Sequence, residues 1–200
     1  AARLQLVLLG AGLDARAHRL SSLAKVRVFE VDHPATQRLK RAKARGLPVL
    51  AKELHYVPCD FQRTQLDTAL IEAGFDPQSP SIWIWEGVTL YLPEEAVLDS
   101  LTRIARLSAK DSLLIATYLT PDLVTGGRSL GAQAAKVLGM VAEPVRFTRT
   151  SEQLAQILVA HGFEVLSDAA PVEAAPHYNI EVKRPSTLMP KERIVVASRR

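Results

Sequence analysis

An apolar run followed at once by a glycine turn opens the chain and limits the folds available to it. Residues 4–9 are almost entirely apolar, and Gly10, Gly12 and Asp14 follow in the sequence GAGLD. A buried strand that ends in two closely spaced glycines and leads into a helix typically binds nucleotide-like cofactors. The glycines permit a tight turn and a close approach of the ligand to the backbone. We therefore predict that an adenosine-containing cofactor binds at this turn.

Strand-like and helix-like patterns alternate along the rest of the chain. Continuous apolar strands between amphipathic helices predict an α/β fold with a mainly parallel, doubly covered sheet. Because Pro58 lacks a backbone donor, its strand is expected at a sheet edge. The expected strands after the first are 26–32, 54–60, 82–85, 113–119, 163–166 and 194–197, and the expected helices are 13–23, 34–45, 66–73, one with Pro93 at its first position and one capped at Thr150.

Two segments interrupt the alternation, residues 120–149 with four glycines and residues 171–190 with four prolines. We expect one domain over residues 1–200, with both segments as insertions on the substrate side, because such loops often carry function. Surface excursions without a function are an equally good interpretation of each.

The composition narrows the class of protein. Apolar residues make up 48% and charged residues 23%, which are ordinary globular values. The apolar runs are too short to span a bilayer, and the lone Cys59 indicates a reducing, cytoplasmic location. We expect no signal peptide before the first strand. The basic residues at 38–45 have no interleaved aromatics and fit the solvated end of a helix. We therefore expect neither a nucleic acid nor a membrane as a partner.

Acidic residues stand at or just after the ends of the first four predicted strands, as Asp14, Asp32, Asp60 and Glu86. The carboxyl ends of parallel strands meet at one edge of a sheet, where ligands bind. Asp32 lies twenty residues after Gly12, at the spacing of an acid that binds a ribose diol. A carboxylate at Asp14 would repel a pyrophosphate on the turn, whereas S-adenosylmethionine carries a sulfonium and an ammonium and has no phosphate. The charges therefore favour S-adenosylmethionine over NAD.

Three blocks, residues 7–16 (VLLGAGLDAR), 29–34 (FEVDHP) and 85–92 (WEGVTLYL), resemble the leucine carboxyl methyltransferase family. The resemblance is greatest to its bacterial branch associated with O-methylation in polyketide biosynthesis, and it continues through residues 143–147, 161–163 and 192–197. It implies a class I methyltransferase fold, Rossmann-like, with seven strands of which the last is antiparallel. It also implies helices before the first strand that close over the site, and we expect the chain to lack this lid.

The resemblance assigns roles to residues of the predicted site. Gly10 and Gly12 would form the cofactor turn, and Asp32 would bind the ribose hydroxyls. Asp60 and Phe61 would lie at the adenine. The remaining positions are Glu86, expected near the methionine end of the cofactor, and Arg16, which either touches the ligand or pairs with Asp14.

The resulting hypothesis is an S-adenosylmethionine-dependent O-methyltransferase that acts on a carboxylate or hydroxyl of a small metabolite. The alternatives are a protein carboxyl methyltransferase acting on a chain-terminal leucine, an NAD-dependent oxidoreductase, and a remnant that binds a ligand without catalysis. A carboxylate acceptor needs no general base, but a hydroxyl would benefit from one. The sequence assigns no catalytic residue and no metal site, and the candidate bases are His33, Tyr91, His177 and Tyr178.

Overall fold

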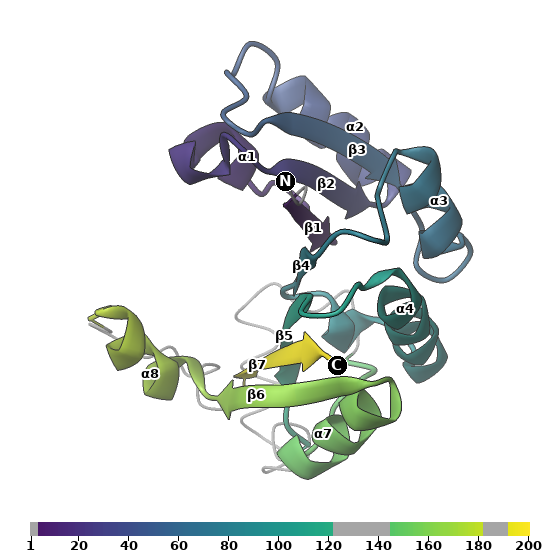
Figure 1. Cartoon of the computed structure of the whole chain (residues 1–200), viewed down its shortest axis with the longest axis vertical. Helices are drawn as coiled ribbons and strands as arrows, with labels where there is room; N and C mark the ends of the chain where they lie inside the picture. Colours follow the sequence, from purple (N-terminus) through teal and green to yellow (C-terminus); the bar gives the residue numbers. More distant parts are fainter. Residues whose placement is uncertain (1–3, 122–144, 182–191) are drawn as a thin grey trace.

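A single seven-stranded sheet organises the part of the chain that the computed structural model describes, residues 4–121, 145–181 and 192–200. The strand order is β3-β2-β1-β4-β5-β7-β6 (Figure 1). The strands are β1 (Gln5–Leu9), β2 (Arg27–Asp32), β3 (Glu53–Pro58), β4 (Ser81–Trp85), β5 (Leu113–Leu119), β6 (Phe163–Ala169) and β7 (Glu192–Arg199).

The pairing confirms the predicted class. Strands β1 to β5 are paired in parallel, and β7 is antiparallel to both β5 and β6. Strand β3, which ends at Pro58, lies at an edge of the sheet as predicted. The parallel pairing brings the carboxyl ends of β1, β2, β3 and β4 to one edge.

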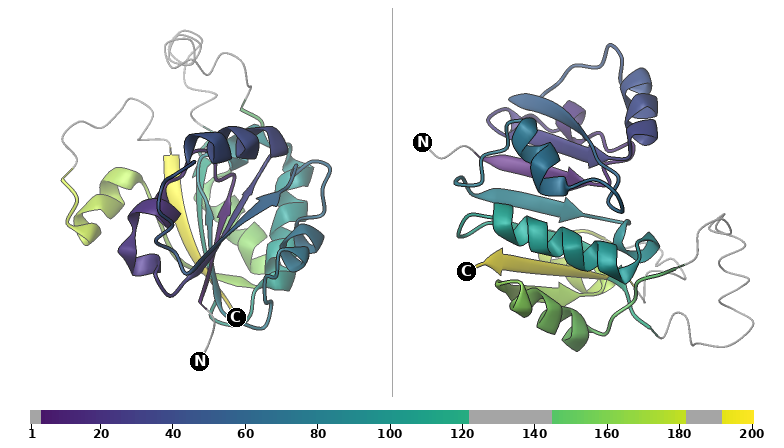
Figure 2. Two further views of the ribbon diagram at one scale, coloured as in Figure 1. Left: turned by 90° about the horizontal axis from the view of Figure 1, so that it is seen from above. Right: turned by 90° about the vertical axis from the view of Figure 1, so that its right-hand side faces the viewer.

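Helices cover both faces of the sheet because side chains alternate along each strand. On one face α3 (Leu66–Glu72), α4 (Glu94–Leu107) and α7 (Ser151–Ala160) lie side by side (Figure 2) and pack on a core that includes Trp83 and Trp85. Helices α1 (Arg16–Arg19) and α2 (Pro34–Lys43) belong to the opposite face, where Leu8, Val28 and Ala17 form a smaller core. Thr150 caps α7 as predicted, in a reciprocal pair of hydrogen bonds with Gln153.

The first helix is much shorter than predicted. Instead of one helix over 13–23, the chain forms α1 and then a 3-10 turn, η1 (Ser21–Leu23). The carbonyl of Ala17 accepts hydrogen bonds from the backbone N–H groups of Leu50 and Ala51, so it is not available to extend the helix. Pro93 likewise stands just before α4 and not at its first helical position. The sequence pattern was wrong at these two helix boundaries.

The two predicted insertions are described in part. Residues 122–144 of the first lie outside the described residues, as do residues 182–190 of the second. The described start of the second forms α8 (Pro171–Ala174) and a 3-10 helix, η4 (Ala175–Tyr178), beyond the end of β6 (Figure 1). None of the helices within the described ranges has the length and apolar character needed to cross a membrane.

Candidate functional site

The turn after β1 is fixed against the end of β2. Gly10 and Gly12 adopt φ angles of 69° and 49°, in the left-handed region that favours glycine. The N–H groups of Gly10 and Ala11 both donate to the carbonyl of Val31, at 2.8 and 3.0 Å. The turn is therefore held in place by the protein itself.

The two glycines meet different surroundings. A Cβ on Gly10 would lie 2.2 Å from Cγ2 of Val88, so packing alone already requires a glycine there. A Cβ on Gly12 would meet no atom nearer than the carbonyl oxygen of Gly10, at 3.9 Å. At Gly12 the backbone conformation favours glycine, but no protein atom crowds a Cβ, so the space beside this residue is open to a ligand.

Asp32 joins the turn to the end of β2. Its carboxylate accepts hydrogen bonds from the backbone N–H of Gly12 at 2.5 Å and of His33 at 2.6 Å. Oδ2 accepts the bond from Gly12 and Oδ1 accepts the bond from His33, so each oxygen has a second lone pair that is available to another donor. The carboxylate is thus oriented before any ligand arrives.

A cavity of about 470 Å³, here called the Asp32 cavity, lies beside this carboxylate. Its size is within the range of small-molecule sites, roughly 300–1,000 Å³. Asp60 and Phe61 line it on the β3 side, and the Phe61 ring lies 6.2 Å from the ring of Trp85. The full lining is Gly10, Asp32, His33, Cys59, Asp60, Phe61, Gln62, Val88, Tyr91, Leu92 and Arg146.

The wall of this cavity formed by the 3-10 turn η2 (Thr89–Tyr91) is held by β5. The N–H of Gly87 donates to Oγ1 of Thr117 at 2.9 Å, and Oγ1 of Thr89 donates to the carbonyl of Thr117 at 2.8 Å. These bonds fix the segment between Glu86 and Tyr91 relative to the sheet.

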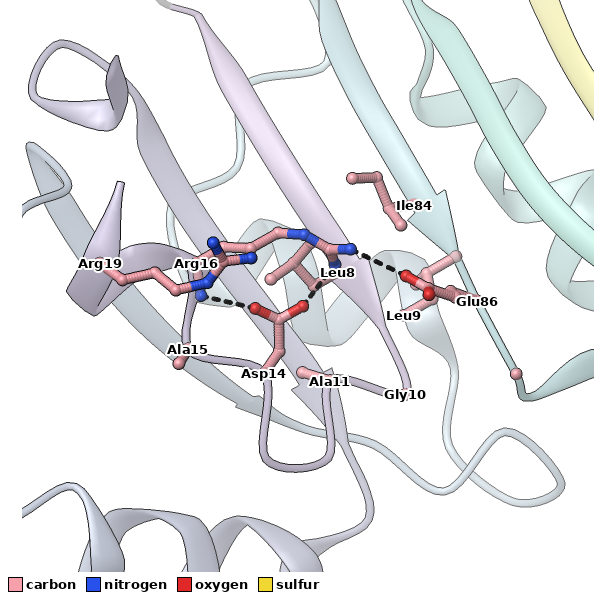
Figure 3. A pocket seen from close by; sticks show the side chains of 11 residues that line it. Leu8, Leu9, Gly10, Ala11, Asp14, Ala15, Arg16, Arg19, Ile84 and Glu86 are labelled. Atoms are coloured by element: carbon pink, nitrogen blue, oxygen red, sulfur yellow. Dashed lines mark hydrogen bonds and ion pairs between the residues drawn. The ribbon is translucent and has the colours of Figure 1, made fainter. Parts of the chain in front are cut away.

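A second cavity of about 430 Å³, here called the Arg16 cavity, lies at the ends of β1 and β4 (Figure 3). The Arg16 guanidinium pairs with Asp14, and it lies 2.8 Å from Glu86. Burial disfavours the charged guanidinium, but hydrogen bonds and charge from Glu86 and Asp14 outweigh burial and raise the pKa of Arg16. Arg16 therefore pairs with Asp14, and it also bridges to Glu86, which the sequence did not indicate.

The two cavities share Gly10, and between them they contain almost every predicted site residue. Asp32, Asp60 and Phe61 line the first; Asp14, Arg16 and Glu86 line the second. Gly12 lines neither but donates to Asp32. The structure thus brings the predicted residues together at one edge of the sheet.

Of the candidate bases, two line the Asp32 cavity. These are Tyr91 and His33, whose Nδ1 accepts a hydrogen bond from the N–H of Ala35 and so caps α2. His177 and Tyr178 are exposed on η4 and line neither cavity. Within the described ranges, no group of His, Cys, Asp and Glu side chains is suited to hold a metal ion.

The sequence assigned no cavity role to Val88, Cys59 or Arg146. Arg146 belongs to one of the blocks of the resemblance, which was the only signal for it. Burial raises the pKa of the Cys59 thiol to about 11, so this side chain is a buried apolar group and not a reactive thiolate.

The comparison with protein families decides where the chain belongs. The model of the family "Leucine carboxyl methyltransferase" matches residues 1–105, which contain both glycines and every predicted site residue. The chain belongs to the leucine carboxyl methyltransferase family. The resemblance inferred from the sequence is thereby confirmed.

Curated proteins with similar sequences include proteins from actinobacteria. A candidate S-adenosyl-L-methionine-dependent methyltransferase of Mycobacteroides abscessus is 34% identical over 82% of this chain and 55% of its own length. A similarly named protein of Frankia alni is 38% identical over 70% of this chain and 49% of its own length. The chain spans about half the length of the curated relatives it matches.

Solved structures support the fold of this family member. The superposition with mitomycin 7-O-methyltransferase covers the whole of this chain and 49% of that enzyme, with a TM-score of 0.61 and 21% sequence identity. The superposition with magnesium protoporphyrin IX methyltransferase from Synechocystis PCC 6803, solved with bound SAH (S-adenosylhomocysteine), covers the whole of this chain and 75% of that enzyme, with a TM-score of 0.55 and 16% identity. A pericyclic reaction enzyme superposes with a TM-score of 0.60 and 16% identity. Since that enzyme shares the fold, the superpositions establish the fold alone.

Proposed function

We propose that the chain is the cofactor-binding part of an S-adenosylmethionine-dependent O-methyltransferase that acts on a carboxylate or hydroxyl of a small metabolite. The observation that carries the proposal is the Asp32 carboxylate, fixed by the N–H groups of Gly12 and His33 beside a cavity that Asp60 and Phe61 also line. A prearranged carboxylate suits the ribose hydroxyls, and an acid next to an aromatic ring suits the adenine.

The rest of the site fits the remainder of the cofactor. The Arg16 cavity adjoins through Gly10 and contains both acidic and basic groups, which suits the ammonium and carboxylate of an amino acid. Oε2 of Glu86 accepts a hydrogen bond from Arg16, but Glu86 is still the acid best placed to receive an ammonium, because its side chain is 59% exposed beside that cavity. The open space next to Gly12 admits a ligand close to the backbone.

One part of the sequence argument is weaker in the structure. Asp14 is paired with Arg16, so its charge is largely compensated and it repels a pyrophosphate less than an isolated carboxylate would. The preference for S-adenosylmethionine over NAD therefore rests on family membership and on the named relatives.

When bound, the cofactor supplies a methyl group on a sulfonium, and the residues of this chain bind it, orient it and exclude water. Displacement at a methyl carbon depends mostly on alignment, which a fixed turn and a fixed carboxylate provide. A carboxylate acceptor requires no proton transfer. For a hydroxyl acceptor, Tyr91 is the better placed of the two cavity bases, because Nδ1 of His33 is occupied by the N–H of Ala35.

Titration calorimetry with S-adenosylhomocysteine tests the proposal, with Asp32→Asn as the variant and Asp99→Asn on the outer face of α4 as the control of equal charge change. Loss of a hydrogen bond to a charged acceptor corresponds to roughly 1.5–3 kcal/mol, or about a 10- to 150-fold weaker affinity for Asp32→Asn. The control should bind like the wild type. Unchanged affinity in Asp32→Asn would refute the ribose assignment.

A further inference from the structure

The Asp32 cavity contains one cation that the cofactor assignment does not use. Arg146 lines this cavity and is exposed. Within the described residues, its side chain forms neither an ion pair nor a hydrogen bond. A guanidinium has five donors and is always charged, so an unpaired one at the wall of a ligand cavity is available to an anion.

The neighbouring arginines differ from Arg146 in this respect. Nε of Arg63 lies 3.9 Å from the carboxylate of Asp60. Arg149 pairs with Glu94 and lies over the Phe147 ring, 4.6 Å from its centroid. Each of these two therefore has a protein partner, whereas Arg146 has none in the described part of the chain.

The backbone of Arg146 is fixed against the cavity wall. The N–H groups of Arg146 and Phe147 both donate to the carbonyl of Leu90 in η2, at 2.8 and 3.4 Å. The Phe147 side chain is only 1% exposed and packs in the main core. The backbone of Arg146 is therefore fixed next to Tyr91, and this limits the positions that its guanidinium can reach.

The charges of the cavity explain what such a cation would do. Asp32 and Asp60 line the same cavity and would repel an acidic molecule that entered beside the cofactor. We propose that Arg146 binds an anionic group of the methyl acceptor, so that the acceptor is a small acid; this inference rests on the proposed function. Arginine suits this role because its planar guanidinium donates two parallel hydrogen bonds to the oxygens of one carboxylate.

The reaction indicates which anionic group Arg146 holds. In the transfer an acceptor oxygen bonds to the methyl carbon while the carbon–sulfur bond breaks and its electron pair stays on sulfur. A carboxylate that becomes an ester loses its charge, so a cation on that same carboxylate would stabilise the reactant more than the transition state. Arg146 should therefore bind a second, non-reacting carboxylate. The substrate class is then a dicarboxylic acid or a hydroxy acid, and Arg146 determines KM more than kcat.

A binding experiment tests this without a known substrate. Adipate and 4-hydroxybenzoate, each beside its neutral amide, are titrated into the chain saturated with S-adenosylhomocysteine. We expect at least one acid to bind the wild type about tenfold more tightly than its amide, and Arg146→Gln to remove that preference. Arg146→Lys should keep part of it. Arg106→Gln, an equal charge change at an exposed position of α4, should leave it unchanged.

The remaining outcomes contradict the inference in distinguishable ways. Equal binding of acids to the wild type and Arg146→Gln, or no binding of either acid to the wild type, would overturn it and leave the proposed function intact. A loss of S-adenosylhomocysteine affinity in Arg146→Gln as large as the loss for the acids would assign Arg146 to the cofactor, and also overturns it. Failure of the wild type to bind S-adenosylhomocysteine contradicts the proposed function, and this inference with it.

Discussion

Substituting alanine for each of the two turn glycines should show which glycine is needed for stability and which for cofactor binding. Gly10 and Gly12 lie two residues apart and both have positive φ angles. Their surroundings differ, because a Cβ on Gly10 overlaps Val88 and a Cβ on Gly12 points into open space. Gly10→Ala should mainly damage stability, and Gly12→Ala should mainly damage cofactor binding.

The magnitudes follow from the geometry. A left-handed backbone costs a non-glycine residue about 1–2 kcal/mol, which applies to both variants. At Gly10 the new Cβ would lie 2.2 Å from Val88 Cγ2, and an overpacked contact of this kind adds about 1–3 kcal/mol. We therefore expect Gly10→Ala to lower the free energy of unfolding by about 2–5 kcal/mol and Gly12→Ala by about 1–2 kcal/mol.

Urea unfolding of the ligand-free chain measures both values, and the double variant Gly10→Ala/Val88→Ala isolates the overlap. Shortening Val88 removes the atom that the new Cβ meets, so the double-mutant cycle should show a coupling of about 1–3 kcal/mol. Titration with S-adenosylhomocysteine then completes the comparison. Gly12→Ala should remain folded and bind S-adenosylhomocysteine about tenfold or more weakly, since the proposed binding mode places the ligand against this position.

Two results would refute this reasoning. Equal destabilisation by the two alanines, without coupling to Val88, would show that the overlap at Gly10 does not determine stability. Wild-type affinity of Gly12→Ala for S-adenosylhomocysteine would show that the ligand does not lie on the turn.

Two further predictions concern buried and exposed charges. Lys40 pairs with Glu30, with 5% and 1% of the side chains exposed, so Lys40→Met should cost about 3–5 kcal/mol in urea unfolding at pH 7. Burial raises the pKa of Glu30, so the stability lost in Lys40→Met should become smaller as the pH falls and Glu30 is protonated. Adding Glu30→Gln to Lys40→Met should recover part of the lost stability at pH 7. A loss of stability that does not depend on pH would contradict this prediction. Hydrogen bonds from Arg27 and then His55 lower the pKa of Glu53 from 4.5 to about 2, so its contribution is present above pH 4.5 and disappears as the pH falls toward 2. Thermal unfolding from pH 5 to pH 2.5 should therefore depend less on pH in Arg27→Gln than in the wild type, and identical pH profiles would disprove the assignment.

The parts of the fold that depend on local pattern could be predicted from the sequence. Apolar strands and amphipathic helices alternate, and parallel pairing then brings Asp32, Asp60 and Glu86 to one edge. The position of the cavities follows from the same rule. Pro58 at the end of an edge strand was equally predictable, since proline cannot donate to a neighbour.

Features that depend on contacts between distant residues could not be predicted in this way. Arg16 bridges to Glu86 across 70 positions of the sequence. The first helix is short because the carbonyl of Ala17 accepts hydrogen bonds from the backbone N–H groups of residues 50 and 51. The spacing of apolar residues along a helix gives no information about such a contact. Arg146 reaches the Asp32 cavity because its backbone binds the carbonyl of Leu90.

Thermal unfolding of the chain with S-adenosylhomocysteine, with NAD and with neither tests the central claim most directly. A ligand at a hundred times its dissociation constant stabilises the folded state by about 2.7 kcal/mol. For a domain of this size, that corresponds to a rise in Tm of about 5–10 °C. We expect this rise with S-adenosylhomocysteine and none with NAD. No rise with S-adenosylhomocysteine at saturating concentration, or an equal rise with NAD, would contradict the assignment of the two cavities to S-adenosylmethionine.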